Sequence, residues 1–197
     1  MNRNEKIKAC VDSYERHKNL KVVGSELGIP WQTVYLYLKE FGVNVTGDKK
    51  RYGSAIDKLA REYEEKFKSM VPEAIDNNDS EFQSTVDFSV GSISVDVKVS
   101  RLQSSGRTPK GKSFSSRWAY CISKQKDLAD VFILFALGVG DDIEHIFAIP
   151  NDIAINHSTI SIPYSMKSKW AEFKMQKDDV RGFLVELGNL QAKNIQD

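Results

Sequence analysis

The sequence predicts an α/β domain with a mixed β-sheet, preceded by a small all-α domain. Three stretches lead to this prediction. Residues 21–38 have the apolar spacing of two short helices joined at a glycine. Residues 85–90 and 93–99 alternate polar and apolar side chains, as half-buried strands do, and a Gly-Ser pair between them favours a turn. Residues 130–137 begin with an aspartate and continue as an unbroken apolar run, which is typical of a central strand buried on both faces.

The length and composition suit two modest folding units. With 197 residues, of which 41% are hydrophobic, the chain can bury both a small helical core and a larger α/β core. The polar, basic stretch 44–52 marks the division. We therefore predict four segments: a helical domain at 1–45, a basic linker at 46–53, an α/β domain at 54–190 and a tail at 191–197.

The first domain is expected to hold three helices. Residues 5–17 have apolar side chains at helical spacing, and residues 21–38 continue as helix, tight turn and helix. The second stretch resembles a helix-turn-helix of the resolvase and transposase kind. In that resemblance Gly24 lies where the two helices approach, Gly28 forms the turn and Val34 is a core residue of the second helix. The alternative is a helical hairpin that binds another protein.

The second helix of this motif would enter the major groove of double-stranded DNA. Its outward side chains are expected to be Trp31, Gln32, Tyr35 and Lys39. Gln32 suits the edge of an adenine, and Lys39 suits a phosphate. Trp31 and Tyr35 suit either contacts with bases or packing between domains.

Two acids and a lysine lie in the predicted hairpin. Asp96 follows Asp87 by nine residues, and Lys98 lies two residues further, on the same face of the strand as Asp96. Carboxylates are hard ligands for Mg²⁺ or Mn²⁺, which bind through one or two acids and keep most of their waters. The lysine would orient or deprotonate a water, or hold a phosphate. Alternatively, this face of the strand is exposed to solvent, and Asp96 and Lys98 form pairs with side chains of a neighbouring strand.

This D-x8-D-V-K pattern on a hairpin resembles the core of the PD-(D/E)XK nuclease superfamily, which includes type II restriction enzymes and archaeal Holliday-junction resolvases. The resemblance covers about residues 53–150. It implies a restriction-endonuclease-like mixed sheet flanked by helices, with Mg²⁺ or Mn²⁺ as cofactor. It also implies that Asp87 and Asp96 bind the metal, that the backbone carbonyl of Val97 adds a ligand, and that Lys98 assists the attacking water.

The resolvase-type members begin their first helix with G-S-x-x-E, whose acid completes the metal site, and residues 53–57 resemble this start. Here Asp57 replaces the glutamate, and Val86 replaces the proline that precedes the first strand acid. Glu64 lies seven residues after Asp57, on the same face of the predicted helix, and is the alternative helix acid. Two further acids of that helix compete for the role, Glu62 and Glu65.

The net charge of +1 conceals a local bias. Residues 1–53 have ten Lys or Arg against six acids, and residues 101–126 have seven Lys or Arg and no acid. The second run follows the strand of Asp96 directly, which favours a DNA-clamping loop over a mobile, solvated one. The DNA contacts expected from it are Arg101, Arg107, Lys110, Lys112 and Arg117.

Regular structure is expected to resume after the basic run. Trp170 and Phe173 are expected to be core residues, with a wedge into DNA as the alternative, and the subunit interface is expected near them. The expected elements are a helix at 118–129, strands at 130–137, 143–149 and 158–163, a short helix at 168–176, and a strand or helical turn at 182–187.

Several other classes are disfavoured. The three histidines and two cysteines are too scattered for a zinc finger, there is no P-loop, and no Arg/His/Tyr constellation indicates a recombinase. Two lone cysteines and the lack of a signal peptide or long apolar run predict a soluble, cytoplasmic protein with no membrane partner.

The expected function is that of a metal-dependent endonuclease that hydrolyses phosphodiester bonds in double-stranded DNA, as a restriction-like, homing-type or phage-encoded enzyme. One active site cuts one strand, so we expect a homodimer or a dimer of dimers. The alternative is a non-catalytic DNA-binding regulator built on a degenerate nuclease fold. The DNA target and the biological role stay open.

Overall fold

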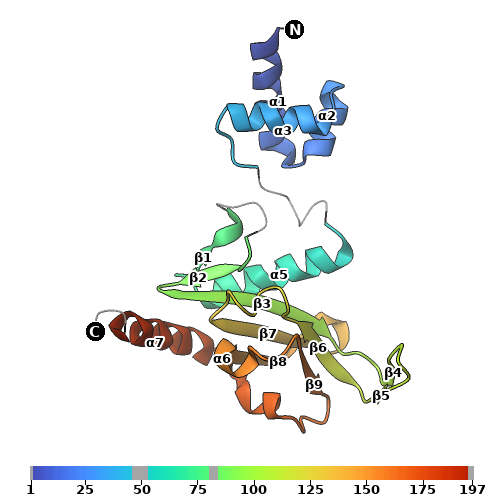
Figure 1. The fold of residues 1–197 in the computed structure, drawn as a ribbon, viewed down its shortest axis with the longest axis vertical. Helices are drawn as coiled ribbons and strands as arrows, with labels where there is room; N and C mark the ends of the chain where they lie inside the picture. The colour runs from blue at the N-terminus through green and yellow to red at the C-terminus, as the bar shows by residue number, and fades with distance from the viewer. Residues whose placement is uncertain (1, 46–52, 80–83, 195–197) are drawn as a thin grey trace. The chain divides into compact units, whose positions relative to one another are not determined.

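The computed structural model describes residues 2–45, 53–79 and 84–194 (Figure 1). The chain divides into two compact units. The first comprises Met1–Lys58 with Asn77–Ser84, and the second comprises Leu59–Asp76 with Thr85–Asp197. Most of the expected linker at 46–53 and the end of the expected tail lie outside the described residues. No helix in the described ranges is long and apolar enough to span a membrane.

Three helices form the core of the first unit, as expected. They are α1 (Arg3–His17), α2 (Leu20–Leu27) and α3 (Trp31–Glu40). A capping box between Asn2 and Glu5 starts α1, and the Asn19 side chain caps α2. Apolar side chains from all three helices are fully buried between them: Cys10, Tyr14, Val23, Val34 and Leu38.

The two glycines of the helix-turn-helix stretch have the expected positions. Gly28 ends α2 in the left-handed conformation, with φ of +66°, which glycine adopts without strain. A Cβ atom on Gly24 would lie 2.6 Å from the carbonyl oxygen of Ile29, so only glycine fits there without a shift of the backbone. The turn therefore requires both glycines.

A six-stranded mixed sheet forms the centre of the second unit, in the order β1-β2-β3-β7-β8-β10. β3 and β7 are parallel, and every other neighbouring pair is antiparallel. The predicted hairpin is present as β2 and β3, but β2 is shorter than expected and begins at Phe88, so Asp87 lies just before the strand. The apolar run is confirmed as the fully buried β7. The strands are β1 (Ile75–Asp76), β2 (Phe88–Val90), β3 (Ile93–Arg101), β7 (Val131–Leu137), β8 (Ile143–Pro150) and β10 (Lys174–Met175).

Different layers cover the two faces of this sheet (Figure 1). Helices α5 (Ala55–Met70) and α7 (Asp179–Asn194) pack on one face, where the buried Tyr63 ring contacts Phe135 of β7 and the buried Phe67 ring contacts Phe88 of β2. On the other face lies a two-stranded sheet of β6 (Arg117–Cys121) and β9 (Thr159–Pro163). The remaining elements are short: β4 (Gly106–Arg107), β5 (Ser113–Phe114), α6 (Asn151–Ala154) and the 3₁₀ turns η1 (Asn77–Asp79), η2 (Val139–Asp141) and η3 (Lys169–Phe173).

The helix expected at 118–129 is wrong. Trp118 and Tyr120 lie in β6 and are buried at alternate positions, because β6 pairs with β9, some 40 residues later in the chain. Residues 182–187 belong to the long helix α7 and not to a strand. Trp170 is buried and Phe173 is half-buried against the β6–β9 face, so they are core residues and not an open surface for a second subunit.

Candidate functional site

The two faces of β3 differ sharply in polarity. Among its odd-numbered side chains, Ile93, Val95 and Val97 are buried in the core to which α5 and α7 contribute, Val99 is partly buried, and Arg101 is exposed. The even-numbered ones are all polar: Ser94, Asp96, Lys98 and Ser100. They lie on the same side as the apolar side chains of β7 that pack against β6 and β9, because residues paired in register share a face.

The two serines of this row have structural roles. Ser94 donates its hydroxyl to Asp130 at 2.8 Å, and its backbone amide donates to the same carboxylate at 2.7 Å. The Ser100 hydroxyl accepts from the backbone amide of Ala119 at 3.1 Å and so joins β3 to β6. The charged residues between them, in contrast, pair with each other.

Asp96 is 1% exposed. Among the cations in the described parts of the chain, only Lys98 lies within hydrogen-bond range of its carboxylate. The Lys98 Nζ donates to Oδ1 at 2.9 Å and lies 2.7 Å from Oδ2. The second contact has the distance of an ion pair without the direction of a hydrogen bond, so Oδ2 is a buried oxygen without a hydrogen-bond partner among the described residues. Burial raises the pKa of Asp96 to about 7; the charge of Lys98 opposes this shift, and the charge of Asp87 adds to it.

Asp87 joins this pair through the backbone. Its carboxylate accepts a hydrogen bond of 2.9 Å from the amide of Val97, the residue between Asp96 and Lys98. The amide and carbonyl of one strand residue point to the same edge of the strand. The Val97 carbonyl is therefore directed to the edge of β3 where Asp87 lies. The structure thus brings together Asp87, Asp96, Lys98 and the backbone of Val97.

These groups fit a small, hard divalent cation. Two carboxylates and one carbonyl are oxygen donors, and Mg²⁺ needs only one or two protein carboxylates because it keeps several waters. The Oδ2 of Asp96 accepts no hydrogen bond from a described residue but lies 2.7 Å from the Lys98 Nζ, so it would bind such an ion only once the ammonium moves away. Within the described ranges no group of three or more His, Cys, Asp or Glu residues could hold a metal. Any such site would therefore depend on the two strand acids, with water and substrate completing the coordination.

The helix acids have other partners. Asp57 accepts from the Ser54 amide at 2.9 Å and from the Ser54 hydroxyl at 2.8 Å, and so caps the start of α5. Glu64 is buried and pairs with Arg61 at 3.0 Å, and Arg61 also pairs with Asp76 of β1 at 2.6 Å. The part of α5 that includes Glu64 packs on the face of the sheet opposite to Asp96. The structure does not bring Glu64 to the strand acids.

The basic run after β3 forms a two-stranded ribbon and not an irregular loop. Gln103 and Arg117 form a bridge at its base, and β4 and β5 pair further out. A turn closes the ribbon, with a bond of 2.8 Å from the Gly111 amide to the Thr108 carbonyl and φ of +78° at Gly111. The sequence T-P-K-G at 108–111 could have predicted this turn, since proline favours its second position and glycine its left-handed fourth.

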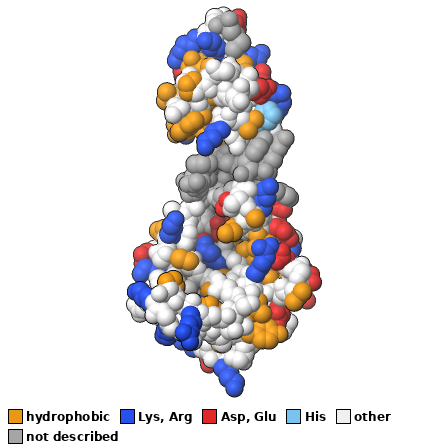
Figure 2. All heavy atoms as spheres, turned by 90° about the vertical axis from the view of Figure 1, so that its right-hand side faces the viewer, with side chains coloured by type: hydrophobic (Ala, Val, Ile, Leu, Met, Phe, Trp, Pro, Cys, Tyr) orange, Lys and Arg blue, Asp and Glu red, His pale blue; other side chains and the backbone are white. Residues whose placement is uncertain are grey.

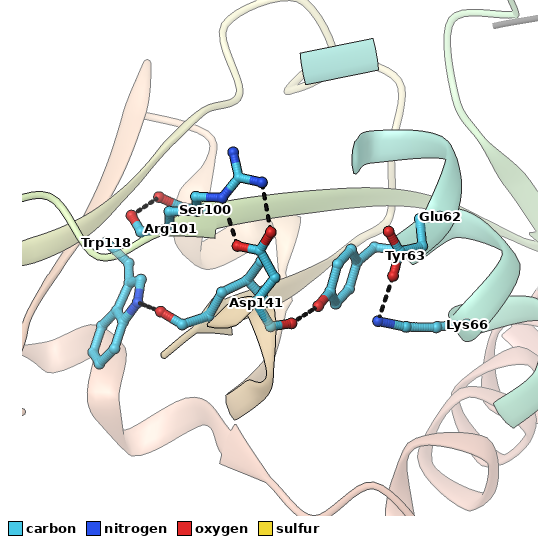
Figure 3. A network of polar contacts seen from close by, with 8 residues as sticks. Glu62, Tyr63, Lys66, Ser100, Arg101, Trp118 and Asp141 are labelled. Atoms are coloured by element: carbon cyan, nitrogen blue, oxygen red, sulfur yellow. Dashed lines mark hydrogen bonds and ion pairs between the residues drawn. The ribbon is translucent and has the colours of Figure 1, made fainter. Parts of the chain in front are cut away.

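Arg101, an expected DNA contact, forms an ion pair within the unit (Figure 3). Its guanidinium donates to both carboxylate oxygens of Asp141, at 2.5 and 2.6 Å. The Tyr63 hydroxyl of α5 donates to the backbone carbonyl of the same Asp141. On the other side, Trp118 donates its indole N–H to the Leu137 carbonyl at 2.9 Å. Arg101 at the end of β3 is thereby tied to Asp141 of η2, and Trp118 of β6 is tied to the end of β7.

The four expected DNA contacts of α3 all point outward. Trp31 is 44% exposed and Tyr35 is 38% exposed, and Gln32 and Lys39 are exposed as well. Leu36 and Phe41 add to the apolar surface of this unit, and Figure 2 shows hydrophobic side chains on its visible face. The side chains expected to meet DNA are thus accessible.

No family model, no curated protein and no solved structure matches the chain.

Proposed function

We propose that the chain is a metal-dependent DNA endonuclease, with Asp87, Asp96 and Lys98 as its catalytic residues. One observation supports this most directly. A buried carboxylate forms an ion pair with a lysine two residues away, and a second acid accepts a hydrogen bond from the backbone between them. Unlike Ser94 and Ser100, neither Asp96 nor Lys98 joins β3 to another element through a described contact. Buried charges without such a structural role often belong to functional sites.

In this proposal the two carboxylates and the Val97 carbonyl hold Mg²⁺ or Mn²⁺. When bound, the ion would supply a Lewis acid for the scissile phosphate and would acidify a bound water. Lys98 is 24% exposed by its side chain, so its ammonium can leave Asp96 and reach a phosphate oxygen or the attacking water. Asp57 and Glu64 are left out of the metal set because of their other partners.

The helix-turn-helix unit would anchor the duplex through the outward face of α3. Gln32 and Lys39 would meet a base edge and a phosphate. The homodimer, or dimer of dimers, stays a prediction, and light scattering on the free protein and on its DNA complex would test it.

The deciding experiment incubates the full chain with plasmid, linear and branched DNA, in Mg²⁺ and then in EDTA. We expect cleavage that depends on the metal and that is lost in Asp96→Asn and Lys98→Met, while DNA binding in EDTA persists. Asp178→Asn, which removes an exposed acid at the start of α7, is the matched control and should cut normally. Cleavage by Asp96→Asn at the wild-type rate would refute the assignment. Binding without cleavage of any substrate would favour the alternative, a regulator on a degenerate nuclease fold.

A further inference from the structure

The ribbon formed by residues 102–117 has four Lys or Arg and no acid, and its sequence predicts a DNA-clamping element. In Figure 1 its strands β4 and β5 project beyond the end of β3, and Figure 2, viewed from that side, shows Lys and Arg side chains spread over the face of this unit. Arg107, Lys110 and Lys112 are exposed, and none of them forms an ion pair with another described residue. No acid lies between residues 101 and 126 to neutralise them.

The shape of the ribbon is held by contacts at three levels. At its base, Gln103 and Arg117 exchange two backbone hydrogen bonds of 2.8 and 3.0 Å. In its middle, the Phe114 ring covers Gly106, and the Arg117 guanidinium lies 4.2 Å from the centre of that ring. At its tip, the amide of Lys112 donates to the Thr108 hydroxyl at 3.1 Å. An isolated hairpin is marginally stable in water, so these contacts matter for its order.

We propose that this ribbon inserts into the major groove of duplex DNA, as a second DNA-binding element in addition to the helix-turn-helix. The inference rests on the proposed function, because it takes DNA as the partner. The major groove of B-form DNA is about 12 Å wide and admits a two-stranded ribbon. Side chains alternate along each strand, so Arg107 points to one face of the ribbon and Lys112 to the other. Cations on both faces and at the tip match a groove whose two walls are phosphate backbones.

The ribbon also continues the strand that bears the proposed catalytic residues. Only a few residues separate Lys98 from the base of the ribbon, and Arg101 fixes that junction through Asp141. A duplex gripped by the ribbon would therefore be positioned relative to Asp96 through a rigid strand.

The test measures binding of the full chain to a short duplex in EDTA, so that cutting is not required. One variant combines Arg107→Gln, Lys110→Gln and Lys112→Gln. The control combines Lys167→Gln, Lys177→Gln and Lys193→Gln, which removes the same charge from exposed positions elsewhere in the unit. We expect the ribbon variant to reduce the slope of log K against log salt by about 0.9 for each phosphate that the ribbon no longer neutralises. The control should keep the wild-type slope.

Groove and shape are tested separately. A duplex with glucosylated 5-hydroxymethylcytosine has a filled major groove. The loss of affinity that this modification causes should be smaller for the ribbon variant than for wild type. Phe114→Ala keeps every cation but removes the support of the ribbon, so it should also weaken binding. Double-stranded RNA, whose major groove is too narrow for side chains, should not compete for the ribbon-dependent part of the affinity.

An unchanged salt slope in the ribbon variant, an equal reduction in the control or full competition by RNA would overturn the inference, as would a complete lack of DNA binding. The proposed function can fail separately. Ribbon-dependent binding without Mg²⁺-dependent cleavage would refute the nuclease and leave the ribbon in place. A ribbon variant that cleaves DNA and binds it as tightly as wild type would refute the ribbon and leave the proposed nuclease in place.

Discussion

The carboxylate of Asp87 takes the place of a strand neighbour for the amide of Val97, with a hydrogen bond of 2.9 Å. The pairing of β2 with β3 ends at Phe88 and Val95. Without the Asp87 side chain, the Val97 amide, which is the next one on the β2 side of β3, would therefore have no partner in the ladder. The bond therefore closes the end of the ladder and holds a second acid beside Asp96.

Asp87→Asn and Asp87→Ala should separate these two effects. Asparagine retains an oxygen that can accept the Val97 amide but loses the charge, so the protein should fold normally and fail to cut DNA. Alanine should in addition lower the free energy of unfolding by about 1–3 kcal/mol, because it leaves a partly buried amide unbonded. Urea unfolding and plasmid cleavage measure the two quantities. Normal cleavage by Asp87→Asn would show that the charge has no role.

Asp96→Asn should change how stability depends on pH when no divalent ion is present. The folded protein has the pKa of this carboxyl at about 7, above its ordinary value of 3.8. A raised pKa in an acid favours the folded state at low pH, and this contribution is lost as pH rises through 7. Wild type should therefore lose up to about 1.4 kcal/mol per pH unit relative to Asp96→Asn between pH 4 and 7. Urea unfolding across this range measures the difference, and parallel stability curves would contradict the assignment. Added Mg²⁺ should reduce the loss in wild type alone.

Arg61→Met should destabilise the protein without affecting the catalytic residues. It leaves the buried Glu64 and the partly buried Asp76 without the guanidinium between them, and breaking a buried pair costs about 3–5 kcal/mol. Cleavage at a temperature where the variant is folded should match wild type. If Arg61→Met had normal stability and could not cut DNA, Glu64 would instead be assigned to the metal site.

Gln32→Ala should affect recognition of a preferred sequence and not general binding. The exposed Gln32 side chain can make two hydrogen bonds to an adenine, and their removal should cost about 1–3 kcal/mol at that site. Gln176→Ala, an exposed glutamine of the larger unit, is the control. Binding to selected and random duplexes at one salt concentration gives the comparison. An equal reduction of affinity on both would indicate a phosphate contact or a structural effect.

Local patterns in the sequence were sufficient for several parts of this protein. The three helices of the first unit, the αL turn at Gly28, the hairpin of β2 and β3, and the buried strand β7 were all predicted from spacing and turn residues. The same patterns placed Asp96 and Lys98 on one face of β3, since side chains alternate along a strand whatever its surroundings.

Only the tertiary structure decided which distant segments meet. Residues 118–121 form a strand because β9 pairs with them, and no local periodicity reveals a partner 40 residues away. Glu64 pairs with Arg61, which also reaches Asp76, because α5 packs beside β1 on the far face of the sheet, although its spacing on the helix suited a metal ligand equally well. Alternation and capping depend on neighbours a few residues apart, so the sequence determines them. The choice of partner depends on how the sheet is ordered and which face each helix covers, which only the folded chain establishes.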